Sequence, residues 1–190
     1  MKTNIAYIAL GSNLGNKRLN IETGIQLIKK ISQTKFKRVS RLYKTPAEGK
    51  TNQPNFLNAV ARIDTELDAE TLLDELMSIE KRVGRVRTGE KNEPRVIDLD
   101  ILLYGNEVYN NIRLTIPHPR MHQRRFVLEP LNEIAPDLVH PTLWKTIRIL
   151  LNGLLQQCHC EKRSDEAISC FPHRTKNRDY HALPPRLESS

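Results

Sequence analysis

The chain has 190 residues, of which 30 are Lys or Arg and 22 are Asp or Glu, so its formal net charge is +8. This length allows one domain with a sizeable core and an extra terminal segment. The basic surplus favours an anionic partner: nucleic acid, an acidic membrane surface or a phosphorylated small molecule. No apolar run approaches the roughly 18 residues of a membrane span, and the N-terminus lacks a signal-peptide layout. We therefore expect a cytoplasmic protein that has no membrane partner.

Strand and helix patterns alternate along the first part of the chain. In chain order, the predicted elements are a strand at Ile5–Leu10, a helix that begins after Asn16, strands at Phe36–Tyr43 and Phe56–Thr65, a helix between Asp68 and Gly84, and a strand at Glu93–Gly105. Apolar or alternating runs indicate the strands, and apolar residues at helical spacing between capping residues indicate the helices. This order predicts an α+β protein with a ferredoxin-like βαββαβ core. Two helices would cover one face of a four-stranded antiparallel sheet and leave the other face open.

C-terminal additions follow this core. They are predicted to be an irregular turn at Thr115–Arg120, a short helix or extended segment at Arg124–Leu131 and an amphipathic helix at Trp144–Leu155. We predict one domain at residues 1–157 and a disordered or loosely attached tail at residues 158–190, because the tail has little periodicity. All three cysteines lie in this tail, so the domain has no disulfide framework, and together with His173 they match no standard zinc-binding spacing.

Two aspartates stand at alternate positions of the last predicted strand. Successive strand side chains point to opposite faces, so Asp98 and Asp100 share one face, roughly 7 Å apart. The apolar alternates Ile97, Leu99, Ile101 and Leu103 are expected on the other face. Polar alternates are also ordinary on a solvated strand face. However, many cationic residues surround this strand in the sequence, namely Arg85, Arg87, Lys91, Arg95, His118, Arg120, Arg124 and Arg125. Two carboxylates among so many cations favour a Mg²⁺–polyphosphate site.

Two aromatic residues suggest a second ligand near this strand. Phe56 begins a predicted strand after a long loop, and Phe126 lies in the basic segment. Either ring can be an ordinary core residue, but together they can hold a planar heterocycle whose edge Asn58 would read. His118 is either a phosphate donor or an ordinary loop histidine. Gly11–Asn16 is either a bare turn or a phosphate cradle at a helix N-terminus.

Seven ordered motifs carry a resemblance to a known family. They are Ala9-Leu10-Gly11-Ser12-Asn13-Leu14-Gly15, Tyr43-Lys44-Thr45-Pro46, Phe56-Leu57-Asn58-Ala59, Gly84-Arg85-Val86-Arg87, Pro94-Arg95-Val96-Ile97-Asp98-Leu99-Asp100-Ile101-Leu102, Ile116-Pro117-His118-Pro119 and Arg124-Arg125-Phe126-Val127-Leu128-Glu129-Pro130-Leu131. In this order and spacing they resemble 6-hydroxymethyl-7,8-dihydropterin pyrophosphokinase of the folate pathway. The resemblance implies transfer of an intact pyrophosphoryl group from ATP to the pterin hydroxymethyl, leaving AMP. The match runs from about Ile5 to Ile149. We expect residues 1–157 to form the catalytic domain, the partners to be small-molecule substrates and not nucleic acid, and the protein to be a monomer.

The resemblance further implies roles for particular residues. Asp98 and Asp100 would bind two Mg²⁺ ions that bridge the triphosphate of ATP. The phosphate-binding residues would be Arg85, Arg95, His118 and Arg124, with Arg87 closing from a loop, and Arg85 and Arg95 would join the two aspartates in catalysis. The pterin would be bound by Thr45, Pro46, Phe56, Asn58 and Phe126. The adenine side would be formed by Leu73, Met77, Glu80 and Ile101.

The chain departs from the family pattern at two places and shares single features with two other classes. Lys91-Asn92-Glu93 stands where the family often has Arg-Trp-Gly, so the tryptophan lid is missing, and Phe56 replaces a common tyrosine. RNA-recognition domains share the ferredoxin-like order, but they use exposed aromatics in their central strands and no acid pair. Phosphohydrolases that form an aspartyl-phosphate usually carry Asp-x-Asp after their first strand, where this chain has none.

Overall fold

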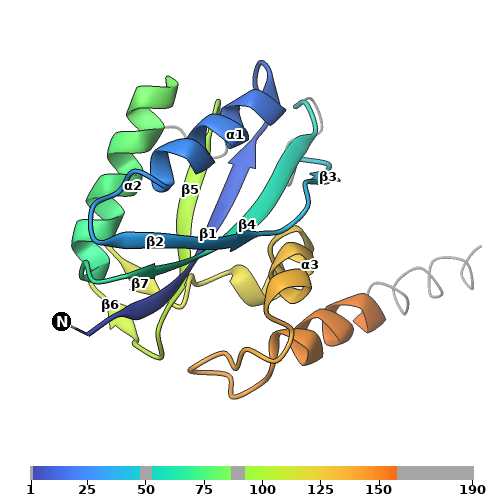
Figure 1. Cartoon of the computed structure of the whole chain (residues 1–190). Coiled ribbons are helices and arrows are strands. Elements are labelled where there is room, and N and C mark those ends of the chain that lie inside the picture. Colours follow the sequence, from blue (N-terminus) through green and yellow to red (C-terminus); the bar gives the residue numbers. More distant parts are fainter. Residues whose placement is uncertain (1, 48–52, 87–92, 158–190) are drawn as a thin grey trace, which may run out of the picture. The chain divides into compact units, whose positions relative to one another are not determined.

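The computed structural model describes residues 2–47, 53–86 and 93–157 (Figure 1). Its elements are β1 (Asn4–Ser12), α1 (Lys17–Ile28), β2 (Thr34–Val39), β3 (Tyr43–Thr45), β4 (Phe56–Thr65), α2 (Ala69–Val83), β5 (Asp98–Tyr104), β6 (Tyr109–Asn110), β7 (Thr115–Ile116), a 3-10 turn η1 (Met121–Gln123) and α3 (Arg125–Ile134). A further helix covers residues 147–157. In these described segments no helix is long and apolar enough to cross a membrane. The predicted tail, residues 158–190, lies outside the described residues.

The main sheet has the strand order β2-β4-β1-β5, and each neighbouring pair is antiparallel. With α1 between β1 and β2, and α2 between β4 and β5, this order confirms the predicted ferredoxin-like core. The predicted strand at Phe36–Tyr43 was wrong in its continuity, because the chain leaves β2 after Val39 and resumes as β3, which pairs with the start of β4. Ser40 makes this break, since its N–H donates to the Val60 carbonyl at 2.9 Å and its hydroxyl accepts from the Val60 N–H at 3.0 Å.

Both predicted helix starts are capped by the expected side chains. Asn16 accepts a hydrogen bond from the Leu19 N–H at 3.2 Å, and Asp68 accepts from the N–H groups of Glu70 and Thr71 at 3.1 and 2.9 Å. α2 ends at Gly84, whose φ of 106° is in the left-handed region that glycine adopts without strain. These caps confirm the helix boundaries that the sequence indicated there.

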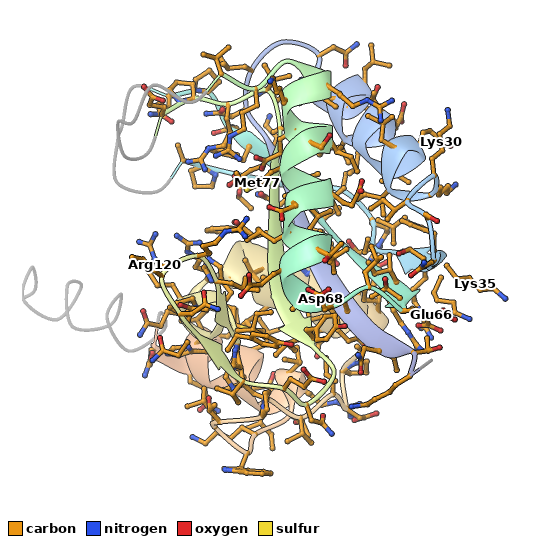
Figure 2. All side chains as sticks on the ribbon, turned by 90° about the vertical axis from the view of Figure 1, so that its left-hand side faces the viewer. Lys30, Lys35, Glu66, Asp68, Met77 and Arg120 are labelled. Carbon is orange, nitrogen blue, oxygen red and sulfur yellow. The ribbon has the colours of Figure 1, made fainter. Side chains whose placement is uncertain are left out.

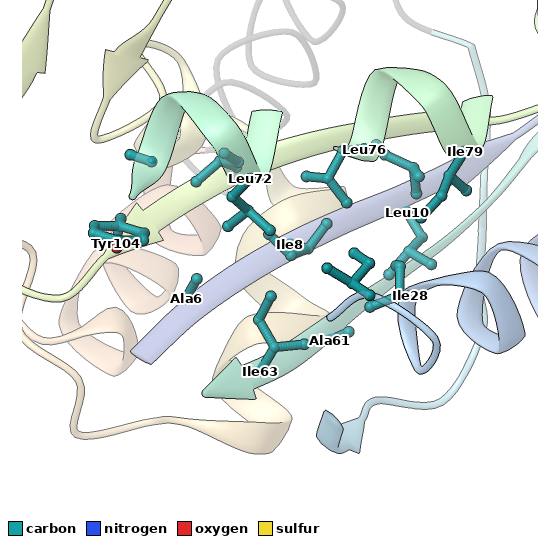
Figure 3. Close-up of a cluster of buried hydrophobic side chains, with 14 of the residues drawn as sticks. Ala6, Ile8, Leu10, Ile28, Ala61, Ile63, Leu72, Leu76, Ile79 and Tyr104 are labelled. Carbon is teal, nitrogen blue, oxygen red and sulfur yellow. The ribbon is translucent and has the colours of Figure 1, made fainter. Parts of the chain in front are cut away.

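One face of the sheet packs against α1 and α2 through a continuous apolar core. In Figure 3, Leu72 and Leu76 of α2 point toward Ile8 and Leu10 of β1, and Ile28 of α1 joins them. Ile8, Leu72, Leu76 and Ile28 are fully buried. Burying side chains of this size stabilises the fold by roughly 1.5–3 kcal/mol each. This core fixes the strand that carries the two aspartates relative to both helices.

The opposite face is not open, as the prediction had it, because α3 and the final helix cover one end of it. Tyr7 and Val60 of the sheet pack there against Val127 and Leu131 of α3 and against Ile147. The segment from η1 to the final helix supplies apolar residues for a second core on this face. The predicted arrangement, with helices on one face of the sheet only, did not include this core. What remains uncovered is the end of this face where β5 begins and β1 ends.

Three further details correct the predicted boundaries. β5 begins at Asp98, so residues 93–97 are not strand. The register of β5 shifts opposite Tyr7 and Ile8, which face Leu103 and Ile101. Leu102 is the extra residue of this bulge, and Leu103 therefore packs on the α3 face and not beside Ile101. The last helix begins at residue 147, after Trp144, whose φ of 54° lies outside the helical region.

Candidate active site

A pocket of about 640 Å³ opens at the uncovered end of the α3 face. Strands β1, β4 and β5 contribute to it, together with β3, the segment after β7 and the start of α3. Its lining includes Ala9, Leu10, Gly11, Thr45, Pro46, Gln53, Phe56, Asn58, Ala59, Arg85, Arg95, Asp98, Asp100, Leu102, His118, Arg120, Arg124, Phe126 and Val127. Eleven of the predicted site residues are among them, namely Thr45, Pro46, Phe56, Asn58, Arg85, Arg95, Asp98, Asp100, His118, Arg124 and Phe126.

Strand register places Asp98 and Asn58 at the same level of the sheet. Gly11 of β1 pairs with Asn58 of β4 on one side and with Asp98 of β5 on the other. A Cβ on Gly11 would lie 3.2 Å from the Asn58 Oδ1 and 3.8 Å from the Asp98 Cβ. Gly11 therefore forms a floor without a side chain, so that the two polar side chains that flank it can face one ligand.

Asp98 is held by two arginines. Arg95 donates from Nη1 to the Asp98 Oδ2 at 2.7 Å, and Arg85 donates to both Asp98 and Glu80. Glu80 is buried on α2 and accepts from the Leu99 N–H at 2.8 Å, which ties α2 to β5. These linked ion pairs are partly shielded from water, so they hold the side chains in position more firmly than an exposed surface pair would.

Asp100 has a different environment from Asp98. Within the described segments, no hydrogen bond is donated to its carboxylate. Burial, together with the nearby charges of Asp98 and Glu80, raises the pKa of Asp100 to about 7. A buried acid next to other acids gains most from a bound cation, because a cation removes the like-charge repulsion.

The carboxylate pair fits a hard divalent cation. No cluster of three or more His, Cys, Asp or Glu side chains suited to a metal is present in the described parts of the chain. Mg²⁺ is commonly bound by only one or two carboxylates, and its remaining ligands are water and substrate phosphates. Asp98 and Asp100 therefore suit Mg²⁺ brought in with a phosphorylated ligand better than a cage built wholly from protein.

An aromatic and amide wall lies on the β3–β4 side of the pocket. The Asn58 Nδ2 donates to the Thr45 Oγ1 at 2.7 Å, which fixes the orientation of the buried amide. The Arg95 guanidinium lies 6.0 Å from the Phe56 ring centroid, and that of Arg124 lies 5.5 Å from the ring centroid of Phe126. Each ring thus lines the pocket beside a cation, so an aromatic ligand and an anionic ligand can bind next to each other.

His118 enters the pocket as a neutral side chain. Burial and the charges of Arg124 and Arg120 lower its pKa to about 4. The Arg120 N–H donates to the His118 Nδ1 at 3.3 Å, so the neutral ring carries its hydrogen on Nε2. At neutral pH the histidine can therefore donate a hydrogen bond to an anion without adding charge to a region that already holds several arginines.

Four predicted site residues do not line this pocket, and a fifth lies outside the described residues. Ile101 lies in the apolar core beneath the helices, and Leu73 packs against the same core. Glu80 is buried behind Arg85. Met77 is 40% exposed on α2, and Arg87 lies outside the described residues. The adenine-side roles of the first four residues and the phosphate-binding role of Arg87 remain predictions.

The structure also supplies site residues that the sequence prediction left out. Asn13 is buried, and its Oδ1 accepts from the Arg95 N–H at 2.7 Å while its Nδ2 donates to the Gln53 Oε1 at 3.3 Å. The N–H groups of Asn13 and Leu14 both donate to the Arg95 carbonyl. The glycine-rich turn therefore holds the segment before β5 and does not present these N–H groups to phosphate. Only the unusual length of the loop that contains Gln53 had pointed to this contact.

Carboxylates for a cation, guanidinium groups for phosphates and rings for a heterocycle, all on one end of a ferredoxin-like sheet, define an enzyme of phosphoryl-group transfer. The family model for 7,8-dihydro-6-hydroxymethylpterin-pyrophosphokinase (HPPK) matches residues 7–136. The chain belongs to this family.

Curated relatives agree with the family match. The chain is 52% identical over 136 residues to the 2-amino-4-hydroxy-6-hydroxymethyldihydropteridine pyrophosphokinase of Haemophilus influenzae, which covers 72% of this chain and 84% of the relative. It is 44% identical over 135 residues to the enzyme of the same name from Pseudomonas aeruginosa, with 71% and 83% covered. The folic acid synthesis protein fol1 of Schizosaccharomyces pombe is 42% identical over 82% of this chain, but this chain spans only 21% of that larger protein.

Solved structures agree on the fold. The crystal structure of wild-type Plasmodium falciparum HPPK-DHPS with STZ-DHP superposes with a TM-score of 0.69 at 20% sequence identity. The match covers 82% of this chain and 44% of that chain. At this identity the likeness supports the fold alone, and the family assignment depends on the sequence matches.

Proposed function

We propose that this protein transfers an intact pyrophosphoryl group from ATP to the hydroxymethyl group of 6-hydroxymethyl-7,8-dihydropterin, giving AMP and the pterin diphosphate of folate synthesis. The observation that carries this proposal is one pocket that joins a carboxylate pair, four arginines and an aromatic wall with a buried amide. The family and its relatives, which are named pyrophosphokinases, support the reaction.

The pterin is assigned to the β3–β4 side of the pocket. Phe56 and Phe126 would stack on its ring system, and the loss of a tyrosine hydroxyl at position 56 leaves the ring face intact. Asn58, with its Nδ2 donating to the Thr45 Oγ1, keeps its Oδ1 for the donors on the edge of the pterin. Pro46 closes the same wall. An amide fixed in this way discriminates between heterocycles by hydrogen bonding, since a mismatched edge would leave a buried polar atom unpaired.

The phosphate chain is assigned to the β5 side. Arg85, Arg95, Arg124 and His118 would hold its oxygens and neutralise the charge that develops during transfer. Arg85 and Arg95 also contact Asp98, so their guanidinium groups can link the carboxylate to the phosphate oxygens. Asp98 and Asp100 would hold Mg²⁺, and two ions are expected. When bound, Mg²⁺ would neutralise phosphate charge and polarise the phosphate oxygens.

Positioning is the main contribution of the chain's own residues. Phosphoryl transfer needs the attacking hydroxyl, the phosphorus atom and the leaving group in line, and it needs charge neutralisation more than a strong base. A pterin held on β3–β4 and a phosphate chain held along β5 meet above Gly11, where no side chain intervenes. This placement is the structural reason for assigning a direct transfer between the two substrates.

The reaction is tested by incubating the full-length protein with ATP, Mg²⁺ and 6-hydroxymethyl-7,8-dihydropterin. We expect AMP to form in proportion to the pterin supplied. ADP or free phosphate as the nucleotide-side product would contradict the proposal, and so would AMP formation that does not depend on the pterin.

Three organisational expectations belong with this proposal. Residues 1–157 are proposed as the catalytic domain, and the protein as a cytoplasmic monomer. A chain that ends at Gln157 should keep the pterin-dependent activity and sediment as a monomer. A truncated protein that stays folded but loses activity would show that the tail takes part in the reaction.

A further inference from the structure

Arg120 lines the pocket, but neither the carboxylate network nor the aromatic wall uses its side chain. Four arginines line the pocket, and three of them have described partners: Arg85 and Arg95 contact Asp98, and Arg124 lies over the ring of Phe126. The Arg120 guanidinium makes no hydrogen bond or ion pair with any residue of the described segments. It is therefore a cation at the pocket whose donors are available to a ligand.

The backbone gives Arg120 a defined position. Its N–H donates to the His118 Nδ1 at 3.3 Å, and the His118 N–H donates to the Leu102 carbonyl of β5 at 2.9 Å. At the start of η1, the Met121 N–H donates a hydrogen bond to the His118 carbonyl at 3.0 Å. The residue is thus tied to the β5 edge of the sheet through two short hydrogen-bonded links.

This position separates Arg120 from the pterin wall. The pterin residues Thr45 and Asn58 stand on β3 and β4, whereas the Arg120 segment joins the sheet at β5, with β1 between β4 and β5. In Figure 2, Arg120 is labelled below and to the left of Met77 of α2. Arg120 therefore belongs to the β5 side of the pocket, to which the phosphate chain is assigned above.

We propose that Arg120 is a further phosphate-binding residue, which recognises the phosphate chain of the nucleotide from the β5 side of the pocket. This inference rests on the function proposed above. A guanidinium offers a planar set of donors that matches phosphate oxygens, and it binds them more strongly than a neutral donor does. Arg85 and Arg95 already donate to Asp98, whereas the Arg120 guanidinium can bind phosphate without competition from that carboxylate.

The test measures ligand binding to the full-length protein by titration calorimetry in the presence of Mg²⁺. Arg120→Gln should weaken ATP binding about 10-fold, as expected for one charge-assisted hydrogen-bonding group near solvent. Arg120→Lys should restore part of the affinity, because it keeps the charge and loses the planar fork. Affinity for the pterin should change less than about 2-fold, within the scatter of such single-site effects.

Arg125→Gln is the matched control. Arg125 is also in the basic segment, but its Nε donates to the Glu129 Oε1 at 2.7 Å and it does not line the pocket. We expect its ATP affinity to equal that of the unaltered protein. A loss in Arg120→Gln that is confined to ATP would place the contact at the β- or γ-phosphate, and an equal loss for AMP would place it at the α-phosphate. Either result supports the inference.

Two results would overturn it. The first is an Arg120→Gln protein that binds ATP as well as the unaltered protein does. The second is an equal loss of ATP and pterin affinity, which would indicate a general disturbance of the pocket. The calorimetric result is independent of the reaction, so a protein without pterin-dependent AMP formation would overturn the proposed function while the ATP titration still decides the role of Arg120.

Discussion

The two faces of the sheet are made by the same strands, and they differ in what covers them. Toward α1 and α2, Ile8 and Leu99 lie in a continuous apolar core from which water is excluded. Toward α3, the same strands present Tyr7 and Leu103 to a second core at one end, and Gly11 and Asp98 to the pocket at the other. Because side chains alternate along a strand, neighbouring residues of one strand lie in the stabilising core and in the pocket.

The pocket face tolerates charge because the other face of the sheet is well packed. Asp100 is half-buried near other acids, which disfavours its charged form and raises its pKa. The core under the helices supplies the stability that keeps such a side chain in place. Changes on the pocket face should therefore alter activity first, and changes on the helix face should alter stability first.

The largest expected effect is the loss of a carboxylate from the pocket face. Asp100→Asn should lower turnover by about 10³-fold or more, equivalent to roughly 4 kcal/mol of barrier, because a cation ligand is lost. The metal-free variant should be at least as stable as the unaltered protein at pH 8, since it no longer buries an ionised acid. Turnover with saturating substrates and urea unfolding measure the two quantities. Normal turnover would show that the cation site is misplaced.

Asp98→Asn tests the other carboxylate of the pocket face. It should lower turnover to a similar degree, but it should also reduce the free energy of unfolding by roughly 1–3 kcal/mol. The reason is that Arg85 and Arg95 lose the acceptor that they share. If both aspartate variants had equal stability, the distinction between a paired and an unpaired carboxylate would be wrong.

The counterpart on the helix face is Ile8→Ala. Ile8 is fully buried between the sheet and α2, so the truncation should cost about 2–5 kcal/mol in the free energy of unfolding. Turnover per folded molecule and both Michaelis constants should stay within about 2-fold, provided that the assay is run well below the melting temperature. A large change in KM with little loss of stability would contradict the division between the two faces.

A smaller effect concerns acid sensitivity at the pocket. Because the pKa of His118 falls from 6.5 in the unfolded chain to about 4 in the folded protein, the folded state binds fewer protons between these pH values. Stability should therefore decrease as the pH falls from about 6.5 to 4, by about 2 kcal/mol for this group after allowance for its partial exposure.

His118→Asn should remove this part of the acid loss, as measured by urea unfolding of the metal-free protein at pH 4.5 and 7.5. The pKa of His140 is also lowered by burial, so the variant should keep some pH dependence. An unchanged difference between the two pH values would show that His118 titrates normally in the folded protein.

The smallest expected effect is steric and lies at the pocket floor. Gly11→Ala would place a Cβ 3.2 Å from the Asn58 Oδ1, so the amide must shift by a few tenths of an ångström. The KM for the pterin should rise about 5- to 10-fold, equivalent to about 1 kcal/mol, with the KM for ATP changed less. Gly153→Ala is the control, because nothing lies within 4 Å of the added Cβ. Equal pterin KM values in both variants would rule out a role for Gly11 as the floor.

Much of the fold was predictable because its signals are local. The caps at Asn16 and Asp68, the glycine at the end of α2 and the alternation of Asp98 and Asp100 are all read from neighbouring residues. These features depend on backbone geometry over a few residues, which periodicity and capping chemistry describe well. The second core was missed because nothing local specifies which face a C-terminal helix will cover.

The candidate site was predictable in its residue types but not in its connections. Sequence patterns and the family resemblance indicated Asp98, Asp100 and the arginines around them. They did not indicate that Glu80 and Asp98 share Arg85, that Asn13 holds the segment of Arg95, or that Ile101 lies in the core. Such contacts join segments that are distant in the sequence, so they depend on strand register and helix packing.

Local sequence patterns were enough to predict the strand that carries the two aspartates, the helices that flank it and the chemistry that two acids among many cations can perform. The packing of the chain shows the rest: two arginines hold Asp98, whereas no hydrogen bond is donated to the Asp100 carboxylate within the described segments. His118 is neutral, and a bulge at Leu102 turns Leu103 toward α3. The physical reason is that charge state and facing direction depend on what lies across the sheet and on how much water remains there. Alternation along a strand sets which residues share a face, but only packing determines which of them keep their charge.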